Sequence, residues 1–192
     1  MGEMALKANE KICPARICLF SILCLFLCTA CEDPDGSQNA TRENQVHAEK
    51  SPDRRTVHLY FSDSDNAFLI SEERSFSARI GPEALGSQIV DALLEGPKQA
   101  LERTIPEGTL LRGFYILPNH TAYVDLSGEI RAGHPGGAQT ELMTIYSMVN
   151  SLVLNVPEIE TVKILVEGKE ETTLAGHVDL RFPFRANMLF VR

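Results

Sequence analysis

Apolar and polar positions alternate strictly along residues 56–62. The apolar positions of this run are Val57, Leu59 and Phe61. A period of two predicts a half-buried strand. A polar turn at 63–66 separates it from a second apolar run, for which we predict a shorter strand over 67–71. The turn is short enough to join the two strands as a hairpin.

Two longer segments repeat their apolar residues at every third or fourth position, which is the spacing of an amphipathic helix. The first begins at residues 81–83, where a proline suits the first helical turn, and the Gly-Pro pair at 96–97 ends it. Its apolar stripe consists of Leu85, Ile89 and Leu93. The second follows a glycine-rich loop at 133–137 and extends over 142–153.

Further strands are predicted on both sides of the second helix. The runs 110–117 and 121–126 flank a short turn and predict a β-hairpin. Residues 162–166 alternate again, and a last short strand is predicted over 178–182. The order is therefore β-(β)-α-β-β-α-β-(β). Because each helix stripe needs an apolar cover, we predict an α+β fold with two helices packed on one face of a mixed β-sheet.

Four short motifs lie in order along this pattern. They are Leu93–Pro97 (LLEGP), Ile105–Thr109 (IPEGT), Val124–Gly128 (VDLSG) and Gly176–Leu180 (GHVDL). With these motifs and elements, roughly residues 56–185 resemble the sporulation and spore germination (GerMN) domain family. The resemblance implies a small α/β domain often carried on bacterial envelope lipoproteins, related in shape to ring-forming modules and without established catalysis. It brings no functional residue to carry over, and it does not imply sporulation.

The N-terminus has the layout of a signal peptide, in which basic residues precede an uncharged apolar run over 17–30. This run is shorter than the roughly 20 residues that a membrane-spanning helix needs. Residues 27–31 (LCTAC) resemble a lipobox, in which small residues precede an acylated cysteine. Cys31 is therefore the predicted lipidation site, although Cys28 stands where Leu, Val or Ile is usual. A plain secretory signal is the alternative.

The composition divides the chain into four parts. Residues 32–55 contain too few apolar side chains to repay the entropy of ordering and predict a flexible tether. The predicted organisation is a signal peptide at 1–30, a disordered acidic and polar tether at 31–55, a GerMN-like domain at 56–185 and a C-terminal tail at 186–192.

Charge and cysteine content exclude several classes of function. The 18 Lys and Arg against 26 Asp and Glu give a net charge of −8, which excludes a basic footprint for nucleic acid. All five cysteines lie in the first 31 residues, so the rest of the chain has neither a disulfide framework nor a thiolate metal cluster. The folded part must depend on its apolar core.

Candidate chemical groups have structural explanations at the level of sequence. The five histidines are dispersed singly without a metal-binding spacing; they are His47, His58, His120, His134 and His177. The polar turn at 63–66 opens like a calcium loop, but Phe68 stands where that loop needs glycine. The sequence contains no G-x-S-x-G hydrolase motif. We predict no metal ion and no cofactor.

Two further segments could contribute to a site. The loop 133–137 precedes a helix and could present backbone N–H groups to an anion, such as a carboxylate of a cell-wall peptide, with Arg131 close in sequence. A flexible connection is the simpler interpretation. Asp125 and Glu129 are near enough in sequence to suggest the paired carboxylates of a glycosidase, but acids at a strand end are routinely solvated.

The leading hypothesis is an exported, lipid-anchored, non-enzymatic domain that associates with envelope proteins or with itself. The alternative is a lipoprotein that binds peptidoglycan or another glycan, and a cell-wall hydrolase is the third possibility. The predicted partners are the membrane, through acyl chains on Cys31, and envelope proteins. The predicted location is the cell envelope, at the outer membrane or the periplasmic face in a Gram-negative organism.

Overall fold

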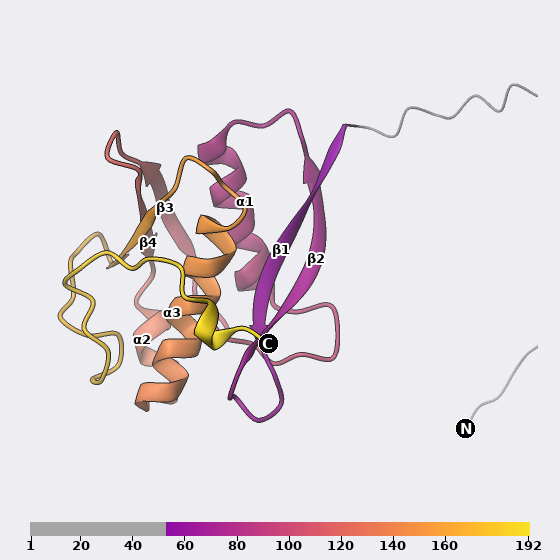
Figure 1. The fold of residues 1–192 in the computed structure, drawn as a ribbon. Coiled ribbons are helices and arrows are strands. Elements are labelled where there is room, and N and C mark those ends of the chain that lie inside the picture. Colours follow the sequence, from indigo (N-terminus) through magenta and orange to yellow (C-terminus); the bar gives the residue numbers. More distant parts are fainter. Residues whose placement is uncertain (1–52) are drawn as a thin grey trace, which may run out of the picture. The chain divides into compact units, whose positions relative to one another are not determined.

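The structure is a computed structural model that describes residues 53–192 (Figure 1). The predicted signal peptide, the lipidation site Cys31, His47 and nearly all of the predicted tether lie outside the described residues. No helix within 53–192 has the length and hydropathy needed to cross a bilayer.

The first sheet is a two-stranded hairpin of β1 (Arg54–Ser62) and β2 (Leu69–Ser77), paired antiparallel. β1 matches the predicted strand, whereas β2 continues six residues beyond the predicted end at residue 71. The apolar pattern stops there because Glu72 and Arg74 occupy inward positions of β2. These two side chains neutralise each other in a buried ion pair, with exposed fractions of 1% and 9%. The second half of β2 therefore cannot be recognised from apolar alternation, because charged residues occupy its buried positions.

The second sheet is mixed and contains β3 (Leu111–Ile116), β4 (Thr121–Leu126) and β5 (Thr161–Val166) in the order β3-β4-β5. β3 and β4 form the predicted antiparallel hairpin, and β5 joins β4 in parallel after a helical crossover. The inner face of this sheet carries buried aliphatic side chains such as Val124 and Ile164.

Two long helices, α1 (Pro82–Glu95) and α3 (Ala138–Val153), pack against both sheets, and the short α2 (Glu129–Ala132) precedes α3 (Figure 1). The predicted stripe of α1 is buried, with Leu85, Ile89 and Leu93 at most 1% exposed. One hydrophobic cluster joins residues from both helices and both sheets. All residues of this hydrophobic cluster lie within the compact unit 47–192. We therefore expect this unit to fold on its own.

The predicted α+β class and the order of elements through β5 are confirmed, and one aspect of the arrangement differs. The strands form two sheets instead of one, because α3 lies against β1 on one side and against β5 on the other. The edge of β1 that would otherwise accept another strand is hydrogen-bonded by the side chains of Ser147 and Ser151 of α3 and of Asn155, which follows the helix.

The predicted strand at 178–182 is wrong within the described chain. Thr173 forms an isolated bridge with Asp179, and Phe184 forms another with Val162 at the edge of β5. The intervening segment is fixed by side chains: Lys163 Nζ donates to the carbonyl oxygens of Leu180 and Arg181 at 3.1 and 2.6 Å. Contacts to individual carbonyls replace the continuous ladder that a strand needs.

The last residues continue across α3 and end beside the β1–β2 turn (Figure 1). Asn187 exchanges two hydrogen bonds with the buried side chain of Asn150. The ring of Phe190 stacks on Tyr146 at a centroid distance of 4.5 Å, and the 3₁₀ turn η1 (Met188–Phe190) contains it. These contacts connect the C-terminal residues to the core.

Candidate functional site

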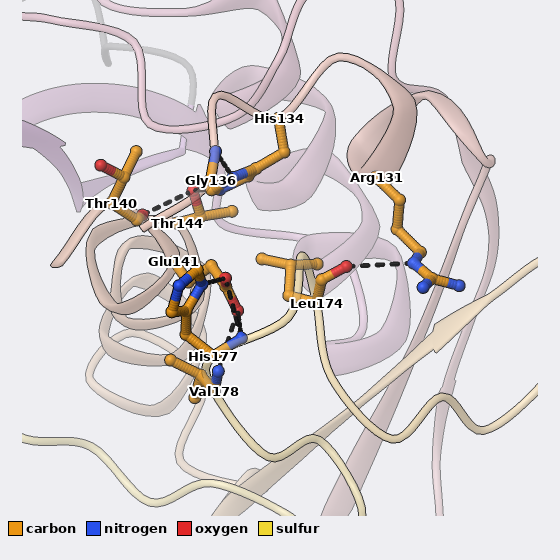
Figure 2. A network of polar contacts seen from close by, with 9 residues as sticks. All are labelled: Arg131, His134, Gly136, Thr140, Glu141, Thr144, Leu174, His177 and Val178. Atoms are coloured by element: carbon orange, nitrogen blue, oxygen red, sulfur yellow. Dashed lines mark hydrogen bonds and ion pairs between the residues drawn. The ribbon is translucent and has the colours of Figure 1, made fainter. Parts of the chain in front are cut away.

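A groove of about 720 Å³ lies between the α2–α3 connection and the loop that follows β5. Its volume is within the range of small-ligand sites. Its charged and polar lining includes Arg131, His134, Glu167, Lys169 and Glu171. Figure 2 shows the polar contacts along its wall, with α3 behind the two loops.

Glu141 of α3 anchors one wall of the groove. Its side chain is fully buried, and its carboxylate accepts hydrogen bonds from the backbone N–H groups of His177 and Val178 and contacts His177 Nδ1 at 2.7 Å (Figure 2). Burial raises the pKa of the Glu141 carboxyl, but these N–H groups and the His177 ring outweigh burial, so the pKa is lowered overall. Glu141 is therefore a charged clamp on the loop.

His134 fixes the opposite wall. Its Nδ1 accepts a hydrogen bond from Gly136 N–H at 2.9 Å, and its Nε2 lies 3.1 Å from Thr144 Oγ1 (Figure 2). Because Nδ1 is the acceptor, the proton of the neutral ring is on Nε2, which donates to Thr144. Burial lowers the pKa of His134, and the nearby charge of Glu141 opposes this shift. His134 therefore cannot act as a general base toward the Thr144 hydroxyl.

Arg131 connects the two walls of the groove. Its Nε donates to the carbonyl oxygen of Leu174 at 3.0 Å (Figure 2). Its Nη1 lies 2.9 Å from Glu171 Oε2. On the same side of the molecule, Glu167 accepts from Gly128 N–H and pairs with Arg112. The charged groups of the groove are thus used mainly to hold loops together.

The predicted loop 133–137 reaches the groove, but its function in the structure is to connect. The His134 side chain fixes this loop, because it bonds both Gly136 N–H within the loop and Thr144 of α3. The Gly136 N–H is therefore used within the loop and is not presented to a ligand. Asp125 and Glu129, the candidate pair of carboxylates, bind different partners in the structure. Asp125 accepts from Gly168 N–H and pairs with Arg112, whereas a hydrogen bond from the Ser127 hydroxyl lowers the pKa of Glu129.

The other candidate groups also serve local structure. Asp63 Oδ1 accepts from the N–H groups of Ala67 and Phe68, four and five residues on, and so closes the β1–β2 turn. The ring of His120 contacts the carbonyl oxygen of Glu158, and the backbone of His58 pairs with Asn155. Within residues 53–192, no group of three His, Cys, Asp or Glu side chains is placed to hold a metal ion.

The residues that sequence reasoning missed are the buried polar side chains of α3. Glu141, Thr144, Ser147 and Asn150 are all fully buried, and every buried side-chain polar atom in the described part of the chain has a hydrogen-bond partner. A signal was present, because these polar residues recur at three- and four-residue spacing among the apolar ones. A polar stripe on a helix normally indicates solvent, and only the tertiary structure shows that it is covered.

The four motifs support the fold at their turns. Gly96 adopts a φ of +94° and ends α1, and Gly108 and Gly176 adopt φ values of +81° and +114°. Such angles favour glycine. Ser127 Oγ accepts from Leu110 N–H and so closes the β3–β4 hairpin at its open end. A family model described as Germane, sporulation and spore germination, matches residues 58–172 and includes three motifs completely. The chain belongs to the Germane family.

Solved structures of Germane domains share the fold. The tandem GerMN domains of the sporulation protein GerM from Bacillus subtilis match with a TM-score of 0.53 and 18% identity, over 66% of this chain and 44% of that chain. The first GerMN domain of the same protein matches with a TM-score of 0.51 and 17% identity, over 66% of this chain and 92% of that one. This chain therefore spans less than half of the tandem protein.

A protein from Clostridium perfringens described as a candidate lipoprotein is 27% identical, with a TM-score of 0.49, over 69% of this chain and 87% of that chain. No curated protein matches the sequence.

Proposed function

We propose that this Germane protein is exported, anchored to the cell envelope through acyl chains on Cys31, and binds another envelope protein without catalysing a reaction. The uncharged run at 17–30 and the small residues before Cys31 support export and acylation. Two or more acyl chains give stable membrane attachment, whereas one chain is marginal.

The observation that carries the binding function is an exposed apolar surface on β3. Tyr115 is 60% exposed on the outer face of β3, and Leu117, which directly follows the strand, is 41% exposed. Leu110, just before the strand, is 64% exposed. Large apolar side chains gathered on a surface indicate an interaction site more strongly than the same residues scattered singly.

The geometry of this surface suits a broad, flat contact. Tyr115 lies opposite Tyr123 in the register, so two aromatic rings come from adjacent strands. A Cβ on Gly113 would approach the Tyr115 ring to 2.9 Å, which shows that the ring lies back across the strand. Aromatic residues are enriched in protein interfaces. In contrast, the groove is lined by no Phe or Tyr side chain, which weighs against sugar stacking there.

The test places a photoactivatable crosslinking residue at Tyr115 of the full chain, expressed with its own N-terminus. The matched control places it at Leu154, which is 46% exposed after α3. We expect a discrete crosslinked protein from position 115 and none from position 154, and a Leu117→Ser variant should weaken this crosslink. Tight binding of the purified domain to sacculi, without a crosslinked protein, would instead support the glycan-binding function.

A further inference from the structure

In β1, the backbone N–H and C=O groups of the even-numbered residues point away from β2. Ser62 exchanges backbone hydrogen bonds with Glu102, and the N–H and carbonyl of Tyr60 bind Ser151 and Ser147 of the α3 region. In an antiparallel pair, successive residues direct their N–H and C=O groups to opposite sides. The odd-numbered residues of β1 therefore bond to β2.

The register then determines which residues of β2 face outward. Leu59 lies opposite Glu72, so the even-numbered residues of β2 form backbone hydrogen bonds with β1. The backbone N–H and C=O groups of the odd-numbered residues point to the open edge of the sheet. The outward residues between the strand ends are Ser71, Glu73 and Ser75. Within residues 53–192, the backbone contacts on this edge are Arg192 N–H to the Leu69 carbonyl and Arg54 Nη2 to the Ser75 carbonyl.

The outer edges of β3 and β5 also carry contacts. Glu83 of α1 accepts from Ile116 N–H at the β3 edge, and Phe184 pairs with Val162 at the β5 edge. Among residues 53–192, the backbone N–H and C=O groups of Ser71 and Glu73 in the middle of β2 have no partner on this edge, and such groups can accept another strand. Figure 1 shows β2 as the outer strand of its hairpin.

The sequence of β2, LISEERSFS, is complementary to itself about its central residue. If two copies run antiparallel with Glu73 opposite Glu73, Ser71 faces Ser75, Glu72 faces Arg74 and Ile70 faces Phe76. Apolar pairs facing each other stabilise a ladder. Glu72 and Arg74 already neutralise each other within each copy, so this register brings no unpaired charge of these two residues against a like charge. A shift in either direction to the next compatible register places Glu72 opposite Glu72, or Arg74 opposite Arg74.

We infer that two copies of this protein pair through their β2 edges about a twofold axis at Glu73, giving a four-stranded sheet in the order β1-β2-β2-β1. This deepens the proposed function, because it names a second copy as a partner and uses the anchor to supply local concentration. A cleft of about 430 Å³ between β2 and α1 includes Phe76 in its lining. Ile70 of the second copy comes next to Phe76 and enters this cleft.

Two features make this pairing weak in solution. Arg192 and Val191 already occupy the edge beside Leu69, so the new ladder extends only over Ser71–Ser75. The two Glu73 carboxylates face each other, and the net charge of −8 on each chain adds repulsion. Confinement to one membrane surface offsets both effects because it raises the encounter frequency of the edges.

Disulfide formation tests the register. Residues 47–192 contain no cysteine, so a single introduced cysteine reports one position. The domain is attached through an N-terminal His tag to phosphatidylcholine vesicles that contain a nickel-chelating lipid, and it is mildly oxidised. We expect Glu73→Cys to give a covalent dimer, because residues that face each other have Cα atoms about 5.5 Å apart, within disulfide range.

The matched control is Ser75→Cys, whose two copies are separated by four residues, or about 14 Å, in this register. It should give little dimer, whereas Ser71→Cys combined with Ser75→Cys should give a dimer with Glu73 intact. Equal crosslinking of Glu73→Cys and Ser75→Cys, or crosslinking of neither with vesicles present, would overturn the inference.

A second pair of variants separates pairing from folding. Glu73→Pro removes an N–H that has no partner among residues 53–192, so the melting temperature should change little while the vesicle-bound association is lost. Glu73→Thr removes the facing charges and should increase association, whereas the same charge change at the exposed Glu158 should not. Should Glu73→Pro fail to fold, the cysteine series still decides. A foreign protein crosslinked at Tyr115 without a β2 dimer would retain the proposed function and refute this inference alone.

Discussion

The side-chain amide of Asn155 pairs with the backbone of His58 as a neighbouring strand would. Its Nδ2 donates to the His58 carbonyl at 2.7 Å, and its Oδ1 accepts from His58 N–H at 3.0 Å. Asn155 is 7% exposed, so little water is available to replace these bonds. The Asn155 amide thus covers one end of the β1 edge, next to the hydrogen bonds that Ser147 and Ser151 of α3 form with Tyr60.

Replacing Asn155 with alanine should therefore destabilise the domain. Asn155→Ala leaves a backbone donor and acceptor of β1 without partners, and we expect a loss of about 2 kcal/mol in the free energy of unfolding. Urea denaturation of residues 47–192 measures it. Asn119→Ala is the control, since Asn119 bonds Thr121 N–H in an exposed turn and should cost less. An equal loss for both variants would contradict the importance of the covered edge.

The buried Glu141 predicts acid sensitivity. Because the folded-state pKa of its carboxyl is lowered below the ordinary 4.5, its stabilising contribution is present above that value and is lost as the pH falls through the folded pKa. Near neutral pH, Glu141→Gln should cost about 1–3 kcal/mol, since one oxygen acceptor is replaced by a donor facing N–H groups.

The pH profile distinguishes this clamp from general acid unfolding. Thermal melts of both proteins between pH 7 and pH 3 should converge as the pH falls, because the wild-type chain loses the contribution that the variant never had. His134 and His177 both lie near Glu141. Including His177→Ala in the same series measures how much of the pH-dependent stability comes from the contact between Glu141 and the His177 ring. Parallel profiles would refute the assignment.

Gly86 permits the close contact between α1 and β3. A Cβ at this position would lie 2.2 Å from the ring of Phe114, which is itself only 8% exposed. We expect Gly86→Val to destabilise the domain by about 1–3 kcal/mol through overpacking, despite the general cost of glycine in a helix. A double-mutant cycle with Phe114→Leu should show that the smaller side chain recovers part of the loss. Additive effects would contradict this contact.

Acylation of Cys31 stays a prediction, and its chemistry is specific. Cys31→Ser removes the thiol that would carry the first acyl chain, so we expect unprocessed precursor or release of the protein from the membrane. Mass spectrometry of the mature protein and detergent partition measure the two outcomes. Cys28→Ser is the control and should be processed and partitioned normally. Normal processing and membrane partition of Cys31→Ser would refute the lipid anchor.

Elements whose burial follows one simple period can be predicted from neighbouring residues alone. The stripe Leu85, Ile89 and Leu93 predicted α1, and the alternation over 121–126 predicted β4, because a helix or strand with one apolar face must bury that face. The four motifs indicate the family, and the glycines of three of them, Gly96, Gly108 and Gly176, occupy turns that need a positive φ. These properties are encoded within a few neighbouring residues.

Only the tertiary structure decided where polar groups are buried. Glu72 and Arg74 interrupt the apolar pattern of β2, yet their pairing buries both. Tyr60 alternates with the apolar positions Val57, Leu59 and Phe61 of β1, yet it is only 7% exposed, because Leu69 and Met143 cover it. The polar stripe of α3 and the open edge of β2 likewise depend on which segments meet. Burial of a polar group requires a partner, and most of these partners lie tens of residues away in the sequence.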